Sequence, residues 1–369
     1  MEVLKVAIIG CGRVAAKHLK AIKTLKKNLV LVGVSDTNSD NANKLLSEFG
    51  FRNIPVYSDF KQMLDEKKPD ICALTVPSGL HYMMACECLN RKINILLEKP
   101  MTMSSAEAKD LYELSHKTEA KICMGHIYRY FPLVGLIQKD IENGVYGKVT
   151  HGVINVRWGH NQDYYDSAAW RGTWKSDGGA LMNQTIHAVD LLFWLMGLKP
   201  VSVTASISNR LRNIEAEDLG MAVFTMENGA LSMIEGTTAT LENNKEAMFS
   251  ISCEKGFINL GLRKGMPFLN ILNEKGKKIN GQYIRRQLKV GGFKSFKYAL
   301  NPHTGIYADL VESIRNGKEP IADAYAGYTS VDNLLGIYKS AKLKTPVELP
   351  LTEPFCTLDM ADFFEKKNI

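Results

Sequence analysis

The chain has 369 residues, of which 45% are hydrophobic and 23% charged, and its net charge is +7. This length allows two domains with hydrophobic cores, and the composition is that of an ordinary globular protein. No apolar run is long enough to cross a bilayer, and the N-terminus lacks the pattern of a signal peptide. Seven scattered cysteines without a second pair at zinc-ligand spacing favour reduced thiols in a cytoplasmic protein and predict no metal site.

The positive charge is spread along the chain. Its densest stretch runs from Arg285 to Lys297, where basic residues alternate with glycine and aromatic residues. We expect a solvated loop there, or a surface that faces small anionic ligands. A nucleic-acid footprint would also be basic, but nothing else in the sequence supports it, and we predict no nucleic-acid partner. A mildly basic protein suits a cofactor with a pyrophosphate and a nucleotide substrate.

The first third of the chain alternates short apolar strands with helices. Unbroken apolar runs such as residues 3–9 are typical of parallel strands that are buried on both faces. The order predicts a doubly wound parallel sheet, an α/β Rossmann domain over residues 1–125. Strands are predicted at residues 3–9, 29–35, 56–57, 71–76, 93–97 and 121–124, with helices between them.

The remaining residues, 126–369, predict an α+β domain with a large, mostly antiparallel open sheet. Two late helices, near residues 305–316 and 325–342, can pack back on the first domain. An open sheet covers one face with helices and needs a partner for the other, so we expect a homo-oligomer, a dimer or tetramer. The elements predicted before them are a helix at 132–143, a strand at 149–158, a helix at 179–196, and strands at 201–208, 219–225, 230–237, 247–252 and 257–260.

A glycine-rich motif of the form G-x-G-x-x-A directly follows the first predicted strand and opens a helix. This is the context that a dinucleotide-binding loop requires. The first glycine permits a tight turn, the second lets the backbone approach a pyrophosphate, and the alanine allows close helix–sheet packing. The phosphates then lie at a helix N-terminus, which favours anions. The predicted cofactor contacts in this motif are Gly10, Gly12, Arg13, Val14 and Ala15.

Asp36 ends the second predicted strand. A carboxylate at this place accepts hydrogen bonds from the adenosine ribose and repels a 2′-phosphate. No arginine stands next to Asp36 to receive that phosphate, so the sequence predicts NAD rather than NADP. The alternatives are a nucleotide-free α/β domain and one that binds FAD. Further predicted cofactor contacts, at or near the ends of later strands, are Thr75, Pro77, His81, Glu98 and Lys99.

Glu98, Lys99 and Pro100 follow the predicted strand at residues 93–97. Residues at the carboxyl ends of parallel strands line the ligand crevice of such a fold. From that place Lys99 can reach both the nicotinamide ribose and a substrate oxygen. It is equally well explained as a surface lysine that pairs with Glu98.

These motifs, with a later helix that carries His187, resemble the glucose–fructose oxidoreductase / inositol dehydrogenase family. The resemblance covers nearly the whole chain, including the order of the two domains. It implies NAD-dependent oxidation of a CH–OH group in which Lys99 is catalytic and Pro100 often follows a cis peptide bond. The alternative from another class is a non-catalytic NAD-binding regulator with a dehydrogenase fold.

The family's second motif places an acidic residue four positions before a histidine on a helix, and here Asn183 and His187 stand at those positions. This spacing puts both side chains on one helical face. An imidazole suits proton transfer from a sugar hydroxyl. An amide can orient a substrate but cannot act as a base, so Asn183 leaves His187 or Lys99 as the proton carrier. A packed helix histidine is the plain alternative for His187.

The segment from Trp170 to His187 resembles the subgroup of dehydrogenases that act on UDP-N-acetylglucosamine-type uronic acids. It reads W-R-G-T-W, then D-G-G, then N-Q-x-x-H. The subgroup implies oxidation of the sugar 3-hydroxyl to a ketone in the biosynthesis of surface-polysaccharide sugars. An inositol or other free-polyol dehydrogenase is the enzymatic alternative. The predicted substrate contacts are Arg129, next to Tyr128, and Trp170, Arg171, Asn183, Gln184, His187 and Tyr307. Tyr307 and the neighbouring His303 are the weaker candidates, because capping and packing explain them nearly as well.

Overall fold

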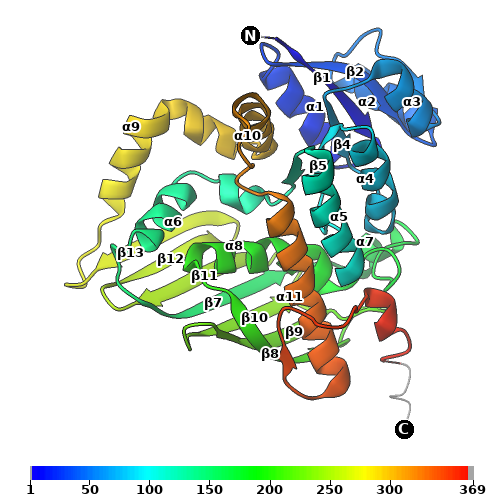
Figure 1. Cartoon of the computed structure of the whole chain (residues 1–369). Coiled ribbons are helices and arrows are strands. Elements are labelled where there is room, and N and C mark those ends of the chain that lie inside the picture. The colour runs from blue at the N-terminus through cyan, green and yellow to red at the C-terminus, as the bar shows by residue number, and fades with distance from the viewer. Residues whose placement is uncertain (1, 365–369) are drawn as a thin grey trace. The chain divides into compact units, whose positions relative to one another are not determined.

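A computed structural model describes residues 2–364 of the chain (Figure 1). The chain divides into two compact units. The first consists of Met1–Thr102, Glu107–Phe131 and Phe296–Tyr328, and the second of Met103–Ala106, Pro132–Ser295 and Thr329–Ile369. The first unit therefore includes a segment near residue 300 that follows most strands of the second unit in sequence. Among residues 2–364, no helix is long and apolar enough to cross a membrane.

The first unit is built on a six-stranded sheet in which all neighbouring strands run parallel, in the order β3-β2-β1-β4-β5-β6. The strand order reverses between β1 and β4, which is where doubly wound folds bind ligands. The predicted doubly wound parallel sheet of a Rossmann fold is thus confirmed. Its strands are β1 (Leu4–Ile9), β2 (Leu29–Ser35), β3 (Val56–Tyr57), β4 (Ile71–Leu74), β5 (Asn94–Leu97) and β6 (Ile122–Met124).

The helices of the first unit bury apolar stripes against this sheet. Leu19 and Ile22 of α1 lie in one core cluster with Ile306 and Leu310 of α10. Helix α10 joins that core although it comes nearly 300 residues after α1, because its apolar face packs on α1. The helices are α1 (Ala15–Thr24), α2 (Ser39–Glu48), α3 (Phe60–Lys67), α4 (His81–Asn90), α5 (Ser105–Thr118) and α10 (His303–Asn316), with short 3₁₀ turns η1 (Ser78–Leu80) and η2 (Ile127–Tyr130).

The second unit is built on an eight-stranded sheet in the order β13-β12-β11-β7-β10-β9-β8-β14. Only the pairing of β10 with β7 is parallel, so the predicted mostly antiparallel sheet is confirmed. Helix α8 lies on one face of this sheet (Figure 1). The strands are β7 (Val149–Trp158), β8 (Pro200–Ser208), β9 (Leu219–Met226), β10 (Leu231–Thr237), β11 (Lys245–Cys253), β12 (Gly256–Arg263), β13 (Met266–Asn273) and β14 (Val347–Glu348).

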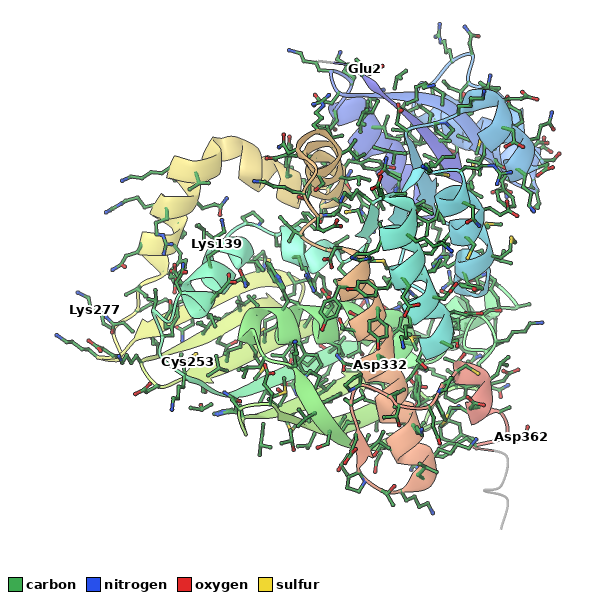
Figure 2. The ribbon with its side chains drawn as sticks, in the orientation of Figure 1. Glu2, Lys139, Cys253, Lys277, Asp332 and Asp362 are labelled. Atoms are coloured by element: carbon green, nitrogen blue, oxygen red, sulfur yellow. The ribbon has the colours of Figure 1, made fainter. Side chains whose placement is uncertain are left out.

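Close packing on the sheet requires glycine at one point of β7. A Cβ on Gly152 would lie 2.5 Å from the sulfur of Met196 on α8. Figure 2 labels two further reference points, Cys253 at the end of β11 and Asp332 on α11. The helices of the second unit are α6 (Val134–Glu142), α7 (Gln162–Asp166), α8 (Ile186–Met196), α9 (Asn280–Ala299) and α11 (Ala324–Leu343), with a π-helix η3 (Leu181–Thr185) and a 3₁₀ turn η4 (Thr357–Met360).

One local prediction was wrong. The basic stretch from Arg285 is not a loop but belongs to α9, which is interrupted at Gly292 with φ 55°. Its first half is fixed by Asp140, which accepts hydrogen bonds from the Tyr283 hydroxyl at 2.5 Å and from Arg286 Nη2 at 2.8 Å. The helix predicted at residues 179–196 is present, and it begins as the π-helix η3 and becomes α-helical at Ile186.

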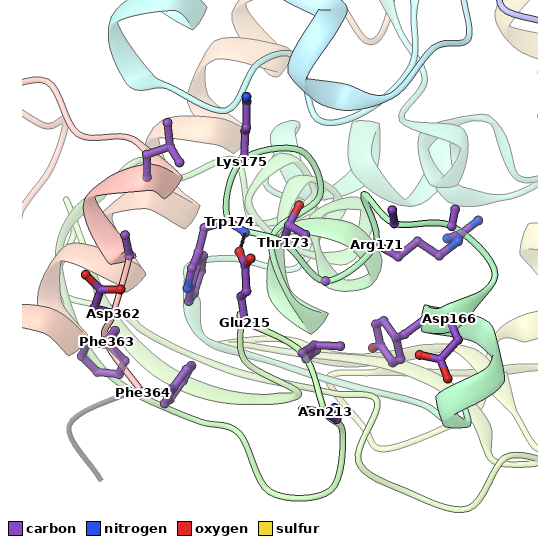
Figure 3. A pocket seen from close by; sticks show the side chains of 17 residues that line it. Asp166, Arg171, Thr173, Trp174, Lys175, Asn213, Glu215, Asp362, Phe363 and Phe364 are labelled. Atoms are coloured by element: carbon purple, nitrogen blue, oxygen red, sulfur yellow. Dashed lines mark hydrogen bonds between the residues drawn. The ribbon is translucent and has the colours of Figure 1, made fainter. Parts of the chain in front are cut away.

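The second unit also contains a cavity of about 770 Å³. Figure 3 shows side chains from three segments around it: α7 with the loop that follows it, the loop before β9, and η4 with the residues that follow it. Arg171, Trp174 and Glu215 are among the lining residues. The cavity thus borders the W-R-G-T-W segment that the sequence singles out.

Candidate cofactor and substrate sites

The glycine-rich loop between β1 and α1 has the geometry of a phosphate-binding turn. Gly10 has φ 91°, and a Cβ there would lie 2.8 Å from the carbonyl oxygen of Thr75. No heavy atom lies within 4 Å of the place that a Cβ on Gly12 would take, so the backbone there is open to a ligand. Helix α1 begins with no side-chain cap from Val14 and no acidic residue in its first turn. This helix N-terminus therefore fits an anionic pyrophosphate.

Asp36 lies directly beside that loop. Its Oδ2 accepts the backbone N–H of Cys11 at 2.6 Å, and its Oδ1 accepts the backbone N–H of Asn38 at 2.8 Å. Each carboxylate oxygen can accept more than one hydrogen bond, so the half-buried Asp36 still fits a ribose diol. Burial and the charge of Asp36 raise the pKa of the Cys11 thiol to about 12, which keeps this cysteine protonated and unreactive.

Two other predicted cofactor contacts support the loop from behind. The hydroxyl of the buried Thr75 lies 3.0 Å from the carbonyl oxygen of Ile9 and also contacts that of Gly10. His81 is buried, with Nδ1 at 2.7 Å from the carbonyl oxygen of Pro100 and Nε2 at 3.1 Å from that of Val76. The half-buried Pro77 separates β4 from η1, while Arg13 is exposed and Val14 half-buried at the loop.

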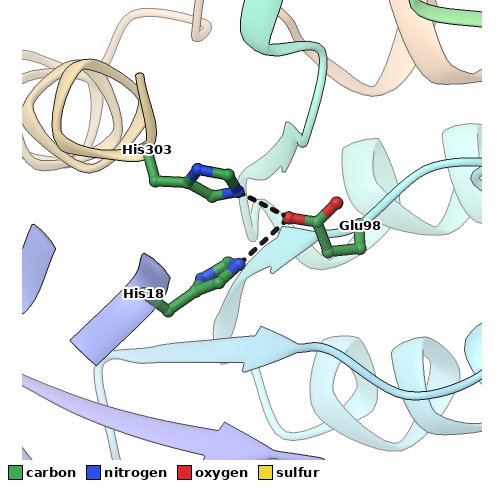
Figure 4. Close-up of side chains that lie close together, drawn as sticks. All are labelled: His18, Glu98 and His303. Atoms are coloured by element: carbon green, nitrogen blue, oxygen red, sulfur yellow. Dashed lines mark hydrogen bonds and ion pairs between the residues drawn. The ribbon is translucent and has the colours of Figure 1, made fainter. Parts of the chain in front are cut away.

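Glu98 is the centre of a buried cluster in the first unit (Figure 4). Its Oε1 accepts hydrogen bonds from Nε2 of His18 and Nε2 of His303, both at 3.0 Å. Burial opposes ionisation of this carboxyl, but the two imidazole donors hold its pKa well below the ordinary value. Burial lowers the pKa of His18. The favoured state is thus an ionised Glu98 beside a neutral His18.

Tyr307, which was predicted to bind substrate, belongs to this cluster. It is 0% exposed, and its hydroxyl lies 3.1 Å from Nδ1 of His18. The atoms of His18, Glu98 and His303 that are able to bind a metal lie within 4.8 Å of one another. The hydrogen bonds from His18 and His303 to Glu98 explain why these atoms lie so close together. Sequence reasoning missed His18, although its place on the apolar face of α1 was a usable signal.

Lys99 lies half-buried at the carboxyl end of β5, beside Glu98. The Lys99–Pro100 peptide bond is cis, as the family resemblance implies. In η2 of the same unit, Nη1 of Arg129 donates to the carbonyl oxygen of Ile321 at 2.7 Å. Burial raises the pKa of the neighbouring Tyr128 to about 12, so its phenol stays neutral.

The predicted substrate residues of the second unit lie at the junction of η3 and α8. Asn183 and Gln184 are in the π-helix, and His187 is in the first turn of α8. All three are half-buried. Nε2 of Gln184 donates to Oδ1 of Asn183 at 3.1 Å. Single π-turns within helices are frequent at functional sites, and no residue pattern in this segment predicts one.

Arg171 is held between two aromatic rings. Its guanidinium carbon lies 4.3 Å from the ring centre of Tyr164 and 4.6 Å from that of Trp170. His160 stacks on Tyr164 with ring centres 3.8 Å apart. Such cation–π contacts fix a guanidinium without neutralising it. Arg171 is therefore a pre-oriented cation able to form paired hydrogen bonds with a carboxylate or phosphate.

The two tryptophans of this segment differ in their surroundings. Trp174 is 3% exposed, and its ring packs edge-on against Tyr338 at 5.3 Å. Its backbone N–H donates to Glu215 Oε2 at 3.1 Å, a contact drawn in Figure 3. Trp170 is half-buried. Packing thus explains Trp174, whereas the ring of the half-buried Trp170 contacts the Arg171 guanidinium.

Comparison with known proteins relates both units to one family. Residues 4–126 match the model described as "Oxidoreductase family, NAD-binding Rossmann fold", and residues 136–259 match the "GFO/IDH/MocA C-terminal domain". The solved WlbA dehydrogenase from Bordetella pertussis, in complex with NADH and UDP-GlcNAcA, is 30% identical with a TM-score of 0.85, covering 95% of this chain and 99% of that one. WlbA from Chromobacterium violaceum, in complex with the same two ligands, is 28% identical with a TM-score of 0.84, covering 96% and 98%.

A third relative is similar over a shorter length. The glucose-6-phosphate 3-dehydrogenase of Bacillus subtilis is 31% identical over 202 residues, which span 52% of this chain and 53% of that protein. The family models and the WlbA structures together follow the order of both units and agree with the cofactor geometry of the glycine loop. The chain therefore belongs to the GFO/IDH/MocA family of NAD-dependent oxidoreductases.

Proposed function

We propose that this protein oxidises the 3-hydroxyl of a UDP-N-acetylamino sugar, the glucuronate, to the 3-keto sugar with NAD as the oxidant. The observation that carries the proposal is the similarity, at 30% and 28% identity over nearly the whole chain, to two dehydrogenases solved with NADH and UDP-GlcNAcA. Oxidation at the 3-hydroxyl is also supported by the similarity to glucose-6-phosphate 3-dehydrogenase. The product would serve the biosynthesis of surface-polysaccharide sugars.

Arg171 is the residue that best supports an anionic sugar. Its guanidinium is held between Tyr164 and Trp170, so little side-chain entropy is lost when it pairs with a carboxylate. A uronate offers such a carboxylate, and a UDP group offers phosphates. Gln184 and Asn183, on the adjoining π-helix, supply neutral hydrogen-bonding groups for the sugar hydroxyls and amide.

The proposed chemistry divides between Lys99 and the helix of His187. Bound NAD supplies the acceptor for the hydride that leaves C3. The ammonium of Lys99 donates a hydrogen bond to the reacting oxygen and favours its negative charge. His187 accepts the hydroxyl proton, so that the C3–H and O–H bonds break as the C=O bond forms. Asn183 orients the ring and has no role as a base.

We further propose that the enzyme prefers NAD to NADP. The carboxylate of Asp36 faces the glycine loop, because its Oδ2 accepts the backbone N–H of Cys11. A 2′-phosphate beside this carboxylate would be repelled. The kcat/KM with NADP is expected to be lower by at least about tenfold, and equal use of both cofactors would contradict this preference.

A second candidate is oxidation of a hexose phosphate at the same position. It is favoured by the 31% identity to glucose-6-phosphate 3-dehydrogenase over 202 residues. Arg171 suits a phosphate as well as a carboxylate. The two candidates differ in the group attached to the sugar, because only the first substrate carries a nucleotide.

A substrate panel tests both candidates. Purified protein is incubated with and without added NAD against UDP-GlcNAcA, UDP-N-acetylglucosamine, glucose 6-phosphate and myo-inositol, and NADH absorbance and the loss of two hydrogens by mass spectrometry are followed. We expect the highest kcat/KM with UDP-GlcNAcA. Turnover of glucose 6-phosphate or inositol in preference to both UDP-sugars would overturn the nucleotide-sugar proposal. Product formed without added NAD would indicate cofactor that stays bound.

A further inference from the structure

Asp177 is a buried carboxylate within the second unit's predicted substrate segment, although it was not among the predicted site residues. It is 2% exposed. Its Oδ2 accepts the backbone N–H of Gly172 at 2.8 Å, and its Oδ1 accepts a hydrogen bond from Nδ2 of Asn183. A buried carboxylate is stable only where such donors replace water. The two contacts therefore constrain both of its partners.

The contact with Asp177 determines which way the Asn183 amide points. An ionised carboxylate only accepts hydrogen bonds, so only the Nδ2 end of the amide can face it. The Oδ1 end is then turned away from Asp177, and it accepts a hydrogen bond from Gln184 Nε2 at 3.1 Å. The amide thus presents an oxygen acceptor in a fixed direction.

The same carboxylate links two segments that carry predicted substrate residues. Gly172 directly follows Arg171 in the loop, and Asn183 lies in the π-helix η3. The loop is closely packed at this point, because Gly172 has φ 68° and a Cβ there would lie 2.7 Å from Ile214 Cγ2. Displacing the Asp177 carboxylate would thus shift the Arg171 backbone and the Asn183 amide together.

We propose that Asp177 is a positioning residue for sugar oxidation: it fixes Asn183 with Oδ1 as the acceptor for a substrate hydroxyl, and it holds the Arg171 loop against η3. This step rests on the proposed function, since it assumes that a sugar hydroxyl meets Asn183. Asp177 does not touch the reacting atoms and takes no proton. Its effect is on the geometry of Asn183 and Arg171.

An exchange of the two side chains tests the proposal. Asp177→Asn leaves two amides in contact, so the direction of the Asn183 oxygen is no longer fixed, and kcat with UDP-GlcNAcA is expected to fall roughly 10- to 100-fold. Asn183→Asp brings two carboxylates together and is expected to lower kcat further. The double variant Asp177→Asn/Asn183→Asp again pairs one amide with one carboxylate, and its kcat is expected to recover at least about fivefold over Asn183→Asp.

The pH profile of kcat gives a readout that a merely structural role would not change. Two carboxylates in contact share a proton and titrate as a pair, so Asn183→Asp is expected to show an ionisation that wild type and the double variant lack. Tyr164, Tyr165 and Glu217 are ionisable groups near Asp177, and none of them is changed in these variants. Asp177→Asn with wild-type kcat and pH profile would overturn the proposal, as would a double variant no better than Asn183→Asp.

Urea unfolding of the four proteins at pH 8 without sugar separates this proposal from the proposed function. Asn183→Asp is expected to unfold at a clearly lower urea midpoint, and the double variant to recover most of the loss. If the urea midpoint of the double variant does not recover, the pairing of Asp177 with Asn183 is overturned, even if UDP-GlcNAcA is oxidised. If the midpoint recovers but the wild-type protein does not oxidise UDP-GlcNAcA, only the proposed function is overturned.

Asp332→Asn is the matched control, because Asp332 is also buried and accepts a backbone N–H, from Leu351 at 3.1 Å. It is expected to leave the pH profile of kcat unchanged.

Discussion

At the scale of single residues, two side chains share the proposed handling of the reacting hydroxyl. Lys99 follows β5 in the first unit, and His187 lies in the first turn of α8 in the second. Each is half-buried, so each is accessible to a ligand while partly shielded from water. Their proposed roles differ, because a lysine ammonium donates hydrogen bonds whereas a neutral imidazole accepts a proton.

Truncation of either side chain is expected to lower kcat strongly. Lys99→Ala removes the donor to the reacting oxygen, and His187→Ala removes the proton acceptor, each with an expected loss of about 10²- to 10⁴-fold. Steady-state rates with UDP-GlcNAcA and NAD measure this loss. Lys109→Ala, at an exposed position of α5, is the control and is expected to keep wild-type kcat. Near wild-type rates for His187→Ala would show that Lys99, and not His187, accepts the hydroxyl proton.

At the scale of elements, the π-helix η3 depends on a buried acid outside it. Glu217 is 0% exposed, and its Oε1 accepts the backbone N–H of Leu181 and the hydroxyl of Tyr338, both at 2.9 Å. A Cβ on Gly179 would lie 2.3 Å from Glu217 Oε2, so the glycine before η3 lets the carboxyl approach. Burial raises the pKa of Glu217 to about 8.

This raised pKa predicts a stability that falls as the pH rises. Between about pH 4.5, where the unfolded carboxyl ionises, and about pH 8 the folded state holds the additional proton. The free energy of unfolding should therefore decrease by about 1.4 kcal/mol per pH unit across this window from Glu217 alone. Glu217→Gln is expected to lose this component and to be more stable than wild type at pH 9, measured by urea unfolding. The exposed Glu227→Gln is the control, and equal slopes for wild type and Glu217→Gln would contradict the assignment.

At the scale of the whole molecule, one face of the second sheet carries an exposed apolar patch on β9 and β10. Val223 and Met233 are neighbours across β9 and β10 and are 46% and 44% exposed. Met221 and Leu231, on the same two strands, are each 52% exposed. The alternate residues Phe224 and Ile234 point the other way and are buried. Exposed apolar patches of this kind mark protein–protein contacts, so we propose that this face joins copies of the chain into a dimer or tetramer.

Charged residues on this face are expected to break the assembly. Val223→Lys/Met233→Lys would place two desolvated ammonium groups in the contact. Light scattering coupled to size-exclusion chromatography should show a dimer or tetramer for wild type and a smaller species for the variant. Leu241→Lys, at a loop residue that is 83% exposed, should match wild type. A wild-type monomer at micromolar concentration would refute the proposed interface.

The sequence alone determined the features that depend on local pattern. The strand–glycine loop–helix order predicted the Rossmann sheet and its cofactor, because tight turns and close backbone approach restrict residue types at fixed spacing. Alternating patterns and turn residues predicted most strands of the second sheet. Strand β13 and helix α9 were not predicted. Helix α9 is held by contacts between residues far apart in the sequence, such as Arg286 with Asp140.

Only the tertiary structure decided the contacts between residues that are far apart in the sequence. It brought His18 and His303 to the same oxygen of Glu98, buried Tyr307 with them, and placed Asp177 on the amide of Asn183. These surroundings then set the charge states, since the two imidazole donors hold the carboxyl group of Glu98 ionised, whereas burial shifts that of Glu217 towards the neutral form. The spacing of residues along the sequence does not predict such contacts, because they form only when the elements pack together.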